Sequence, residues 1–225
     1  AATGGVSLCL YMLGVAETAA QQQGCLRLLT SLLDSCPVNV YDMRRLRGYE
    51  LIARFMQKPR WVLDRGALEA AFDLVRVQRP DEGTEKSFAG AIVDTDALRL
   101  ILLDWRIWSR AEEPLKIALF DGLLSLFTEF PEFNAKRAFA CGAVTELLHI
   151  IESPDVGLAL TQSVVDVLRC IIDPKGTQEN TLEGAKEVAL FLLATHKTES
   201  NVRHTLHTPR VKRFQRSSLA LSAAM

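Results

Sequence analysis

Three histidines near the carboxyl end are candidate metal ligands. His204 and His207 lie three residues apart, with His196 upstream, and this spacing would place two imidazoles on one face of a helix, where they could hold a metal ion. No cysteine or carboxylate cluster accompanies them, and Pro209 follows closely. A solvated helix end or tail explains them better, so we expect no metal and no cofactor.

Two serines in the same region have the pattern of a kinase target. Ser217 and Ser218 follow Arg213 and Arg216, so phosphorylation would add about −2 charges per site beside two arginines and neutralise the basic patch. The basic run at 210–213 also has the pattern of a dibasic processing site, but cleavage there would need a secretory route that the rest of the chain does not support. A plain solubilising tail is the favoured interpretation, with Ser217 and Ser218 as candidate regulatory phosphorylation sites.

The segment Asp-Trp-Arg-Ile-Trp at 104–108 contains the candidate protein-binding residues. Trp105 and Trp108 stand three residues apart, and so on neighbouring faces of a helix, with Arg106 between them. Aromatic residues with an interleaved arginine can form a binding hot spot. Because the segment continues an apolar run at 100–103, a core helix whose indoles pack on adjacent repeats is the simpler interpretation, and we expect one of the two indoles to be buried.

The sequence contains no catalytic or phosphate-binding motif. GxSxG, HExxH, GxxxxGK[ST] and GxGxxG are all absent. Carboxylate pairs such as Glu112–Glu113 stand at the expected starts of helices, where the helix dipole favours negative charge without any catalysis. We therefore expect the chain not to be an enzyme.

The overall composition is that of an ordinary globular protein. Of 225 residues, 48% are hydrophobic and 24% are charged, which disfavours disordered, collagenous and coiled-coil classes. The few glycines and prolines disfavour an all-β fold. Six basic residues against one acid give residues 196–225 a charge of +5, and the net charge of −1 for the whole chain leaves −6 on residues 1–195. The chain as a whole therefore gives no reason to expect specific nucleic-acid binding.

Cysteine usage points to a reducing compartment. The five cysteines form no CxxC pair and have no regular spacing, and most stand in apolar helical patterns, so they are typical of small buried hydrophobic residues. The apolar run Val6–Ala16 lacks a basic flank and is better explained as a first helix than as a signal peptide. No run is long enough to span a bilayer. We expect a cytoplasmic protein.

Glycines recur at a spacing that indicates internal repeats. Gly24 and Gly66 are 42 residues apart, and so are Gly142 and Gly184, each followed by apolar residues at helical spacing. This interval lies within the roughly 40–47-residue period of armadillo and HEAT repeats. We expect each glycine to open a helix at a sharp turn, where close approach or positive φ is needed. The interval between Gly66 and Gly142 is irregular.

Apolar periodicity predicts that the remaining elements are helices. The expected fold is therefore all-α, an armadillo/HEAT-like α-solenoid of antiparallel helix pairs. Residues 1–195 form the repeat domain, with an irregular loop near 79–95 in which 79–84 is the candidate hinge. Residues 196–225 form a basic tail. We expect Ser153 to cap a helix and residues 58–59 and 173–176 to end helices. Helices are expected at 6–16, 26–33, 41–56, 67–77, 97–108, 115–130, 139–151, 156–172 and 185–194.

Several segments of the sequence resemble a known protein family. The segments 47–56, 103–108, 120–133 and 142–151 are similar, in this order, to the helical-repeat region of the large BEACH-domain scaffold proteins, a group that includes the neurobeachin, beige-like anchor and autophagy-linked FYVE types. The resemblance covers roughly residues 24–172. None of the family's BEACH, pleckstrin-like, WD40 or FYVE parts is found in these 225 residues, and the basic tail matches nothing in it.

The resemblance implies a cytosolic, non-catalytic scaffold segment that binds proteins in vesicle trafficking, membrane dynamics or autophagy. It implies association with endomembranes only indirectly, through the parent protein. Two alternatives remain at this point: an independent armadillo-like adaptor or regulatory module of another family, and a helical enzyme with an unrecognised site.

Overall fold

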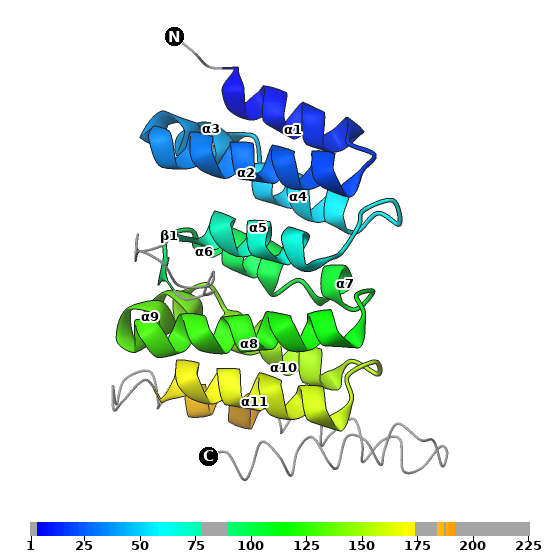
Figure 1. The fold of residues 1–225 in the computed structure, drawn as a ribbon. Coiled ribbons are helices and arrows are strands. Elements are labelled where there is room, and N and C mark those ends of the chain that lie inside the picture. The colour runs from blue at the N-terminus through cyan, green and yellow to red at the C-terminus, as the bar shows by residue number, and fades with distance from the viewer. Residues whose placement is uncertain (1–3, 78–89, 174–183, 187, 192–225) are drawn as a thin grey trace, which may run out of the picture. The chain divides into compact units, whose positions relative to one another are not determined.

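The computed structural model describes residues 4–77, 90–173, 184–186 and 188–191 (Figure 1). These residues are mostly helical, which confirms the expected all-α class. The chain divides into two compact units, Ala1–Leu119 and Phe120–Met225, and we describe each by itself. No helix within the described ranges is long and apolar enough to cross a membrane.

The first unit begins with five helices joined by short turns. They are α1 (Gly5–Val15), α2 (Ala19–Ser35), α3 (Pro37–Arg45), α4 (Gly48–Met56) and α5 (Arg65–Val75). Helix α1 packs on α2, and α2 packs on α5, so these three lie side by side (Figure 1), while α4 contacts α1. A reciprocal capping box starts α2: Thr18 Oγ1 accepts from the Gln21 backbone N–H, and Gln21 Oε1 accepts from the Thr18 N–H.

The rest of the first unit is less regular. A short antiparallel pair, β1 (Arg76–Val77) and β2 (Ala91–Ile92), follows α5. The chain then forms α6 (Thr95–Ala97), a π-helical turn η1 (Leu98–Leu102) and α7 (Trp105–Trp108). Helix α4 and helix α5 both contact η1. Helix α8 (Glu113–Glu129) begins in this unit and crosses the division between the two.

The second unit contains the remainder of α8 and three further long helices. These are α9 (Pro131–Ala140), α10 (Ala143–Glu152) and α11 (Leu158–Ile172), and each of the three contacts the other two. Residues 184–186 and 188–191 are helical as well. Asn134 is fully buried here and donates from Nδ2 to the Leu126 carbonyl at 2.6 Å, which fixes the start of α9 against the end of α8.

Several expected helix boundaries are wrong. The single helix expected at 41–56 is two helices, because Arg47 adopts a left-handed conformation (φ 50°) between α3 and α4. The single helix expected at 97–108 is interrupted by the π-helical turn and by Asp104, which caps α7. Ser153 does not cap the start of a helix: it terminates α10, and α11 begins only at Leu158.

The role expected of the repeat glycines, a positive φ or a close approach at a helix start, is confirmed at some positions and not at others. Gly142 has φ 79° and directly precedes α10, as expected for a glycine at a sharp turn. Gly24 lies inside α2, has no positive φ, and a Cβ there would contact nothing within 4 Å, so at this position the interpretation is wrong. Gly66 has no positive φ, but it is the second residue of α5 and a Cβ there would lie 2.5 Å from Gln23 Oε1, which is the expected close approach.

The cysteines are free thiols in the structure. Cys9 and Cys25 are buried, while Cys36, Cys141 and Cys170 are half-buried. Burial raises the pKa of both the Cys9 and Cys25 thiols, which disfavours the reactive thiolate. The candidate hinge at 79–84 and the basic tail at 196–225 lie outside the described residues.

Candidate protein-binding site

The three candidate residues of the 104–108 segment have different environments. Trp108 is 0% exposed and its indole Nε1 donates to the Ile101 carbonyl at 2.8 Å. Trp105 is half-buried, with the ammonium of Lys116 5.7 Å from its ring centroid, a cation–π distance. Arg106 is exposed. Trp108 is therefore a core residue, and the structure does not bring the two indoles together as one exposed patch.

Asp104 organises this segment. Its carboxylate accepts two hydrogen bonds from the Arg106 guanidinium, both at 2.9 Å, and one from Gln57 Nε2 at 2.8 Å. It also accepts the Arg106 backbone N–H at 3.1 Å, which caps α7. The Asp104 side chain thus links α7 to Gln57, the residue that follows α4. It also binds the Arg106 guanidinium at the start of α7.

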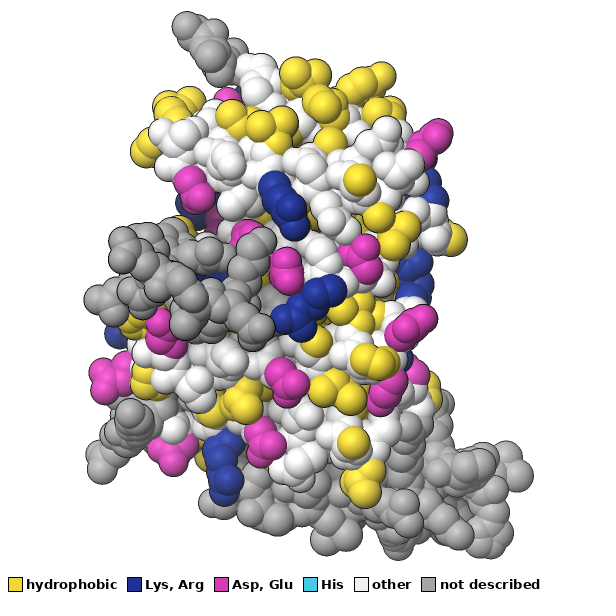
Figure 2. Space-filling view, viewed as in Figure 1, with side chains coloured by type: hydrophobic (Ala, Val, Ile, Leu, Met, Phe, Trp, Pro, Cys, Tyr) yellow, Lys and Arg dark blue, Asp and Glu magenta, His cyan; other side chains and the backbone are white. Residues whose placement is uncertain are grey.

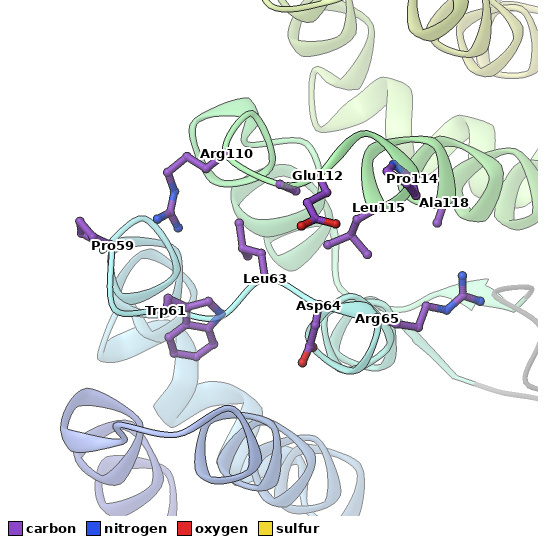
Figure 3. A pocket seen from close by; sticks show the side chains of 11 residues that line it. Pro59, Trp61, Leu63, Asp64, Arg65, Arg110, Glu112, Pro114, Leu115 and Ala118 are labelled. Carbon is purple, nitrogen blue, oxygen red and sulfur yellow. The ribbon is translucent and has the colours of Figure 1, made fainter.

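A pocket of about 740 Å³ lies within the first unit, close to this segment in sequence (Figure 3). It opens between the turn after α4, the start of α5 and the residues that lead into α8. No pattern in the sequence predicted this pocket. Its lining residues are Pro59, Trp61, Leu63, Asp64, Arg65, Arg110, Ala111, Glu112, Pro114, Leu115 and Ala118.

Two glutamines of α2 hold the turn that forms one wall of the pocket. Gln22 is buried; its Oε1 accepts the Val62 N–H at 3.1 Å and its Nε2 donates to the Arg60 carbonyl at 3.3 Å. Gln23 Nε2 donates to both carboxylate oxygens of Asp64, at 2.9 and 3.0 Å. Asp64 in turn accepts the Ala67 N–H at 2.8 Å and caps α5. The turn is therefore fixed at both ends.

Arg110 fixes another side of the pocket. Its guanidinium donates to the carbonyl of Met56, the last residue of α4, and to that of Lys58 in the turn that follows. The final carbonyls of a helix have no partner within the helix, whereas the Lys58 carbonyl also accepts the Trp61 backbone N–H at 2.9 Å. In Figure 3, Arg110 points toward the turn that carries Pro59, away from Glu112. The Arg110 guanidinium is therefore hydrogen-bonded to the protein's own backbone and is not directed at Glu112.

The side chains that face the pocket combine apolar and acidic groups. Figure 3 shows Leu63 and Leu115 approaching from opposite sides, with the Glu112 carboxylate beside them. Both leucines are half-buried and Glu112 is exposed. The buried indole N–H of Trp61, at the same turn, has no hydrogen-bond partner among the described residues. Such a surface suits an apolar side chain of a peptide with a polar or basic neighbour.

The described residues offer no metal site. No group of three or more histidine, cysteine, aspartate or glutamate side chains among them is arranged to hold an ion. His196, His204 and His207 lie outside the described residues, as do Ser217 and Ser218.

Comparison with known proteins finds distant relatives. No protein-family model matches the chain, and no solved structure matches it. The chain is similar to "WD repeat- and FYVE domain-containing protein 4" of mouse, at 23% identity over 202 residues, and of human, at 22% identity over 202 residues. Each match covers 88% of this chain but 6% of the relative, so the chain spans a small part of these proteins. The match agrees in part with the scaffold-family resemblance.

Proposed function

We propose that the chain is a non-catalytic helical-repeat segment of armadillo/HEAT type that binds proteins, as part of a large BEACH-type scaffold in vesicle trafficking, membrane dynamics or autophagy. The observation that carries this proposal is the similarity over 88% of the chain to a far longer WD-repeat and FYVE protein. The proposal places the chain in the cytoplasm, on endomembranes only through its parent protein.

The packing within each unit supports the helical-repeat part of the proposal. Helices contact partners that are near in sequence: α1 with α2, α2 with α5, and α9, α10 and α11 with one another. Repeat proteins bury their core in this way, because each helix pair is covered by its neighbours rather than by a distant segment.

The pocket of the first unit is the surface that we assign to a protein partner. Its apolar part, at Leu63 and Leu115, supplies area to be buried, and its walls are fixed by hydrogen bonds from α2 and Arg110. A preorganised surface loses little side-chain and loop entropy when a partner binds. No nucleophile paired with a base lines this pocket, which favours binding over catalysis.

The test compares two substitutions on the same helix. Leu115→Glu places a charge in the pocket, whereas Ile117→Glu places the same charge at an exposed position of α8 that does not line it. Partners captured from cells by the parent chain and identified by mass spectrometry should be lost with Leu115→Glu and kept with Ile117→Glu, in about 0.15 M and about 0.5 M salt alike. Unfolding curves must first show that both variants are folded.

Two results would count against the proposal. If Leu115→Glu retains every partner, the pocket is not the binding surface. If every partner of the parent chain disappears in about 0.5 M salt, binding is electrostatic, and the packed helical surface plays no part in it.

A further inference from the structure

The pocket of the first unit combines apolar side chains with an unpaired carboxylate. Leu63 and Leu115 approach from opposite sides, with Glu112 beside them (Figure 3). The Glu112 side chain is exposed and has no hydrogen-bond or ion-pair partner among the described residues. Figure 2 shows apolar and acidic side chains interspersed, with a few basic ones, on the face where Figure 1 places the starts of α5 and α8.

The two cations that line the pocket do not neutralise this carboxylate. Arg65 pairs with Glu69, with 3.4 Å between Nε and Oε1, and the Arg110 guanidinium donates to backbone carbonyls. Asp64 is the second carboxylate of the lining, and it accepts neutral donors from Gln23 and from the start of α5. The pocket therefore carries negative charge and is complementary to a basic group.

A buried donor in the same lining adds a second requirement. Trp61 is 5% exposed, and its indole N–H has no hydrogen-bond partner among the described residues. The side chain lines the pocket, and in Figure 3 the nitrogen-bearing edge of the indole is turned toward Leu63. An unpaired buried donor costs free energy. The pocket therefore favours a ligand that brings a hydrogen-bond acceptor, such as a peptide carbonyl.

We propose that the pocket binds a short extended peptide segment of a partner, with one apolar side chain between Leu63 and Leu115 and a lysine or arginine two residues away paired with Glu112. Side chains two residues apart point to the same side of an extended chain, so both reach the pocket while a carbonyl of the segment accepts the Trp61 N–H. The volume of about 740 Å³ lies within the range of small-ligand sites and suits side chains rather than a folded domain. This inference rests on the proposed function, because it specifies the chemistry of the partner at the same pocket.

Selection of a random short-peptide library, displayed on phage, on the immobilised full chain tests this preference. Peptides enriched on the parent should carry an apolar residue with lysine or arginine two positions away, and Leu115→Glu should enrich none of them. Glu112→Lys reverses the charge beside the leucines, so it should instead enrich an acidic residue at the basic position. The matched control is Glu113→Lys, at the adjacent exposed residue outside the lining, which should keep the basic preference.

The affinity of one enriched peptide, measured by fluorescence polarisation, tests the charge pair directly. Glu112→Lys should weaken binding about threefold to tenfold, because an attractive pair becomes repulsive. The same peptide with its basic residue replaced by glutamate should bind Glu112→Lys more tightly than it binds the parent chain.

The contact with the indole N–H has its own measurement. Trp61→Phe removes this donor and should weaken binding of the same peptide about threefold to tenfold. Trp105→Phe, outside the lining, should leave the affinity unchanged. Unchanged affinity in a folded Trp61→Phe variant would overturn the carbonyl contact. The measurements at Glu112 use an exposed position, so they test the proposal even if Trp61→Phe does not fold.

The outcomes separate this inference from the proposed function. If the enriched peptides are lost with Leu115→Glu but show no basic preference, or keep that preference on Glu112→Lys, the pocket binds a partner and the inferred chemistry is wrong. If no peptide is enriched while Leu115→Glu still abolishes capture of protein partners, the inference alone fails. Peptides that bind Leu115→Glu as well as they bind the parent chain would contradict both.

Discussion

Trp108 and Trp105 show how strongly the energetic role of a residue depends on the side of a helix on which it stands. The Trp108 indole is fully buried and its one polar atom is satisfied by the Ile101 carbonyl. Trp105 keeps part of its ring exposed beside Lys116. Large buried side chains contribute most when they leave neither a cavity nor an unpaired donor.

Substitution of each tryptophan by alanine should separate these two environments. We expect Trp108→Ala to lower the free energy of unfolding by about 3–5 kcal/mol, because it opens a cavity and removes a buried hydrogen bond. Trp105→Ala should cost about 1 kcal/mol, since less apolar area is lost. Urea unfolding followed by circular dichroism measures both. Equal losses in the two variants would contradict the environments described for these indoles.

Tyr49 links α4 to the start of α6 through a buried hydrogen bond. Its hydroxyl donates to Asp94 Oδ2 at 2.9 Å, while Asp94 Oδ1 accepts the Asp96 and Ala97 backbone N–H groups at 2.9 and 3.0 Å. Burial, and then the negative charge of Asp94, raise the pKa of Tyr49 well above its ordinary value of 10.0. The folded chain therefore keeps a phenolic proton that the unfolded chain loses in alkali.

This raised pKa predicts an alkaline loss of stability. The contribution of Tyr49 is fully present below a pH of about 10 and declines as the pH rises above it, because only the unfolded state releases the proton. Tyr49→Phe should cost about 1–2 kcal/mol at pH 7 and should make the free energy of unfolding less dependent on pH above about 10. Tyr41→Phe, at a 68% exposed position, is the control. An unchanged alkaline slope in Tyr49→Phe would refute this origin.

Two helix boundaries depend on left-handed backbone geometry. Arg47 (φ 50°) precedes α4, and Gly142 (φ 79°) precedes α10. Glycine adopts this conformation without steric cost, whereas other residues are strained there. A Cβ at Gly142 would contact nothing within 4 Å, so any effect of adding one is conformational.

Exchange of residue types at these two positions should change stability in opposite directions. Gly142→Ala should lower the free energy of unfolding by about 1 kcal/mol, and Arg47→Gly should raise it by up to about 1 kcal/mol. The Arg47–Glu50 ion pair lost in the second variant is exposed at 3.7 Å and contributes little. Calorimetric melting of both variants checks the signs. Destabilisation by Arg47→Gly would mean that its side chain matters more than its backbone.

Helices were predictable from the sequence where apolar periodicity alone defines them, and their interruptions were not. Periodicity places the ends of α10 and α11 within a residue, but the helix expected at 139–151 starts four residues too early, because 139–140 belong to α9 and Gly142 is left-handed. The apolar spacing in the sequence continues across the left-handed residue Arg47 and across the π-helical turn at 98–102, so it gives no sign of either interruption. The start of α2 was available in the sequence as a Thr-x-x-Gln capping box at Thr18.

The candidate site was predictable to a smaller extent. The tryptophan pair at 104–108 stands out in the sequence, but tertiary packing decides that Trp108 rather than Trp105 is buried. The pocket joins residues as far apart as Pro59 and Ala118, and its shape depends on Gln22 reaching the turn about 40 positions away. Long-range contacts of this kind have no local sequence signal.

For the whole molecule, the uneven charge of the chain is the property with a direct functional consequence. Residues 1–195 carry −6 and residues 196–225 carry +5. Any attraction to a polyanion therefore comes from the last thirty residues, and it weakens steeply with salt because it is electrostatic and independent of sequence. Binding of a protein partner at the apolar pocket would persist under the same conditions.

Neutralising the basic cluster should separate these two kinds of interaction. A chain in which Arg210, Lys212, Arg213 and Arg216 are all changed to Gln should lose heparin binding at about 0.15 M salt, while partners of the pocket remain. The matched control removes four exposed positive charges elsewhere, at Arg27, Arg54, Arg99 and Lys136. This control should still bind heparin. Equal loss in both variants would show that net charge, rather than the cluster, governs the attraction. Retained heparin binding in the cluster variant would place the polyanion site outside these four residues.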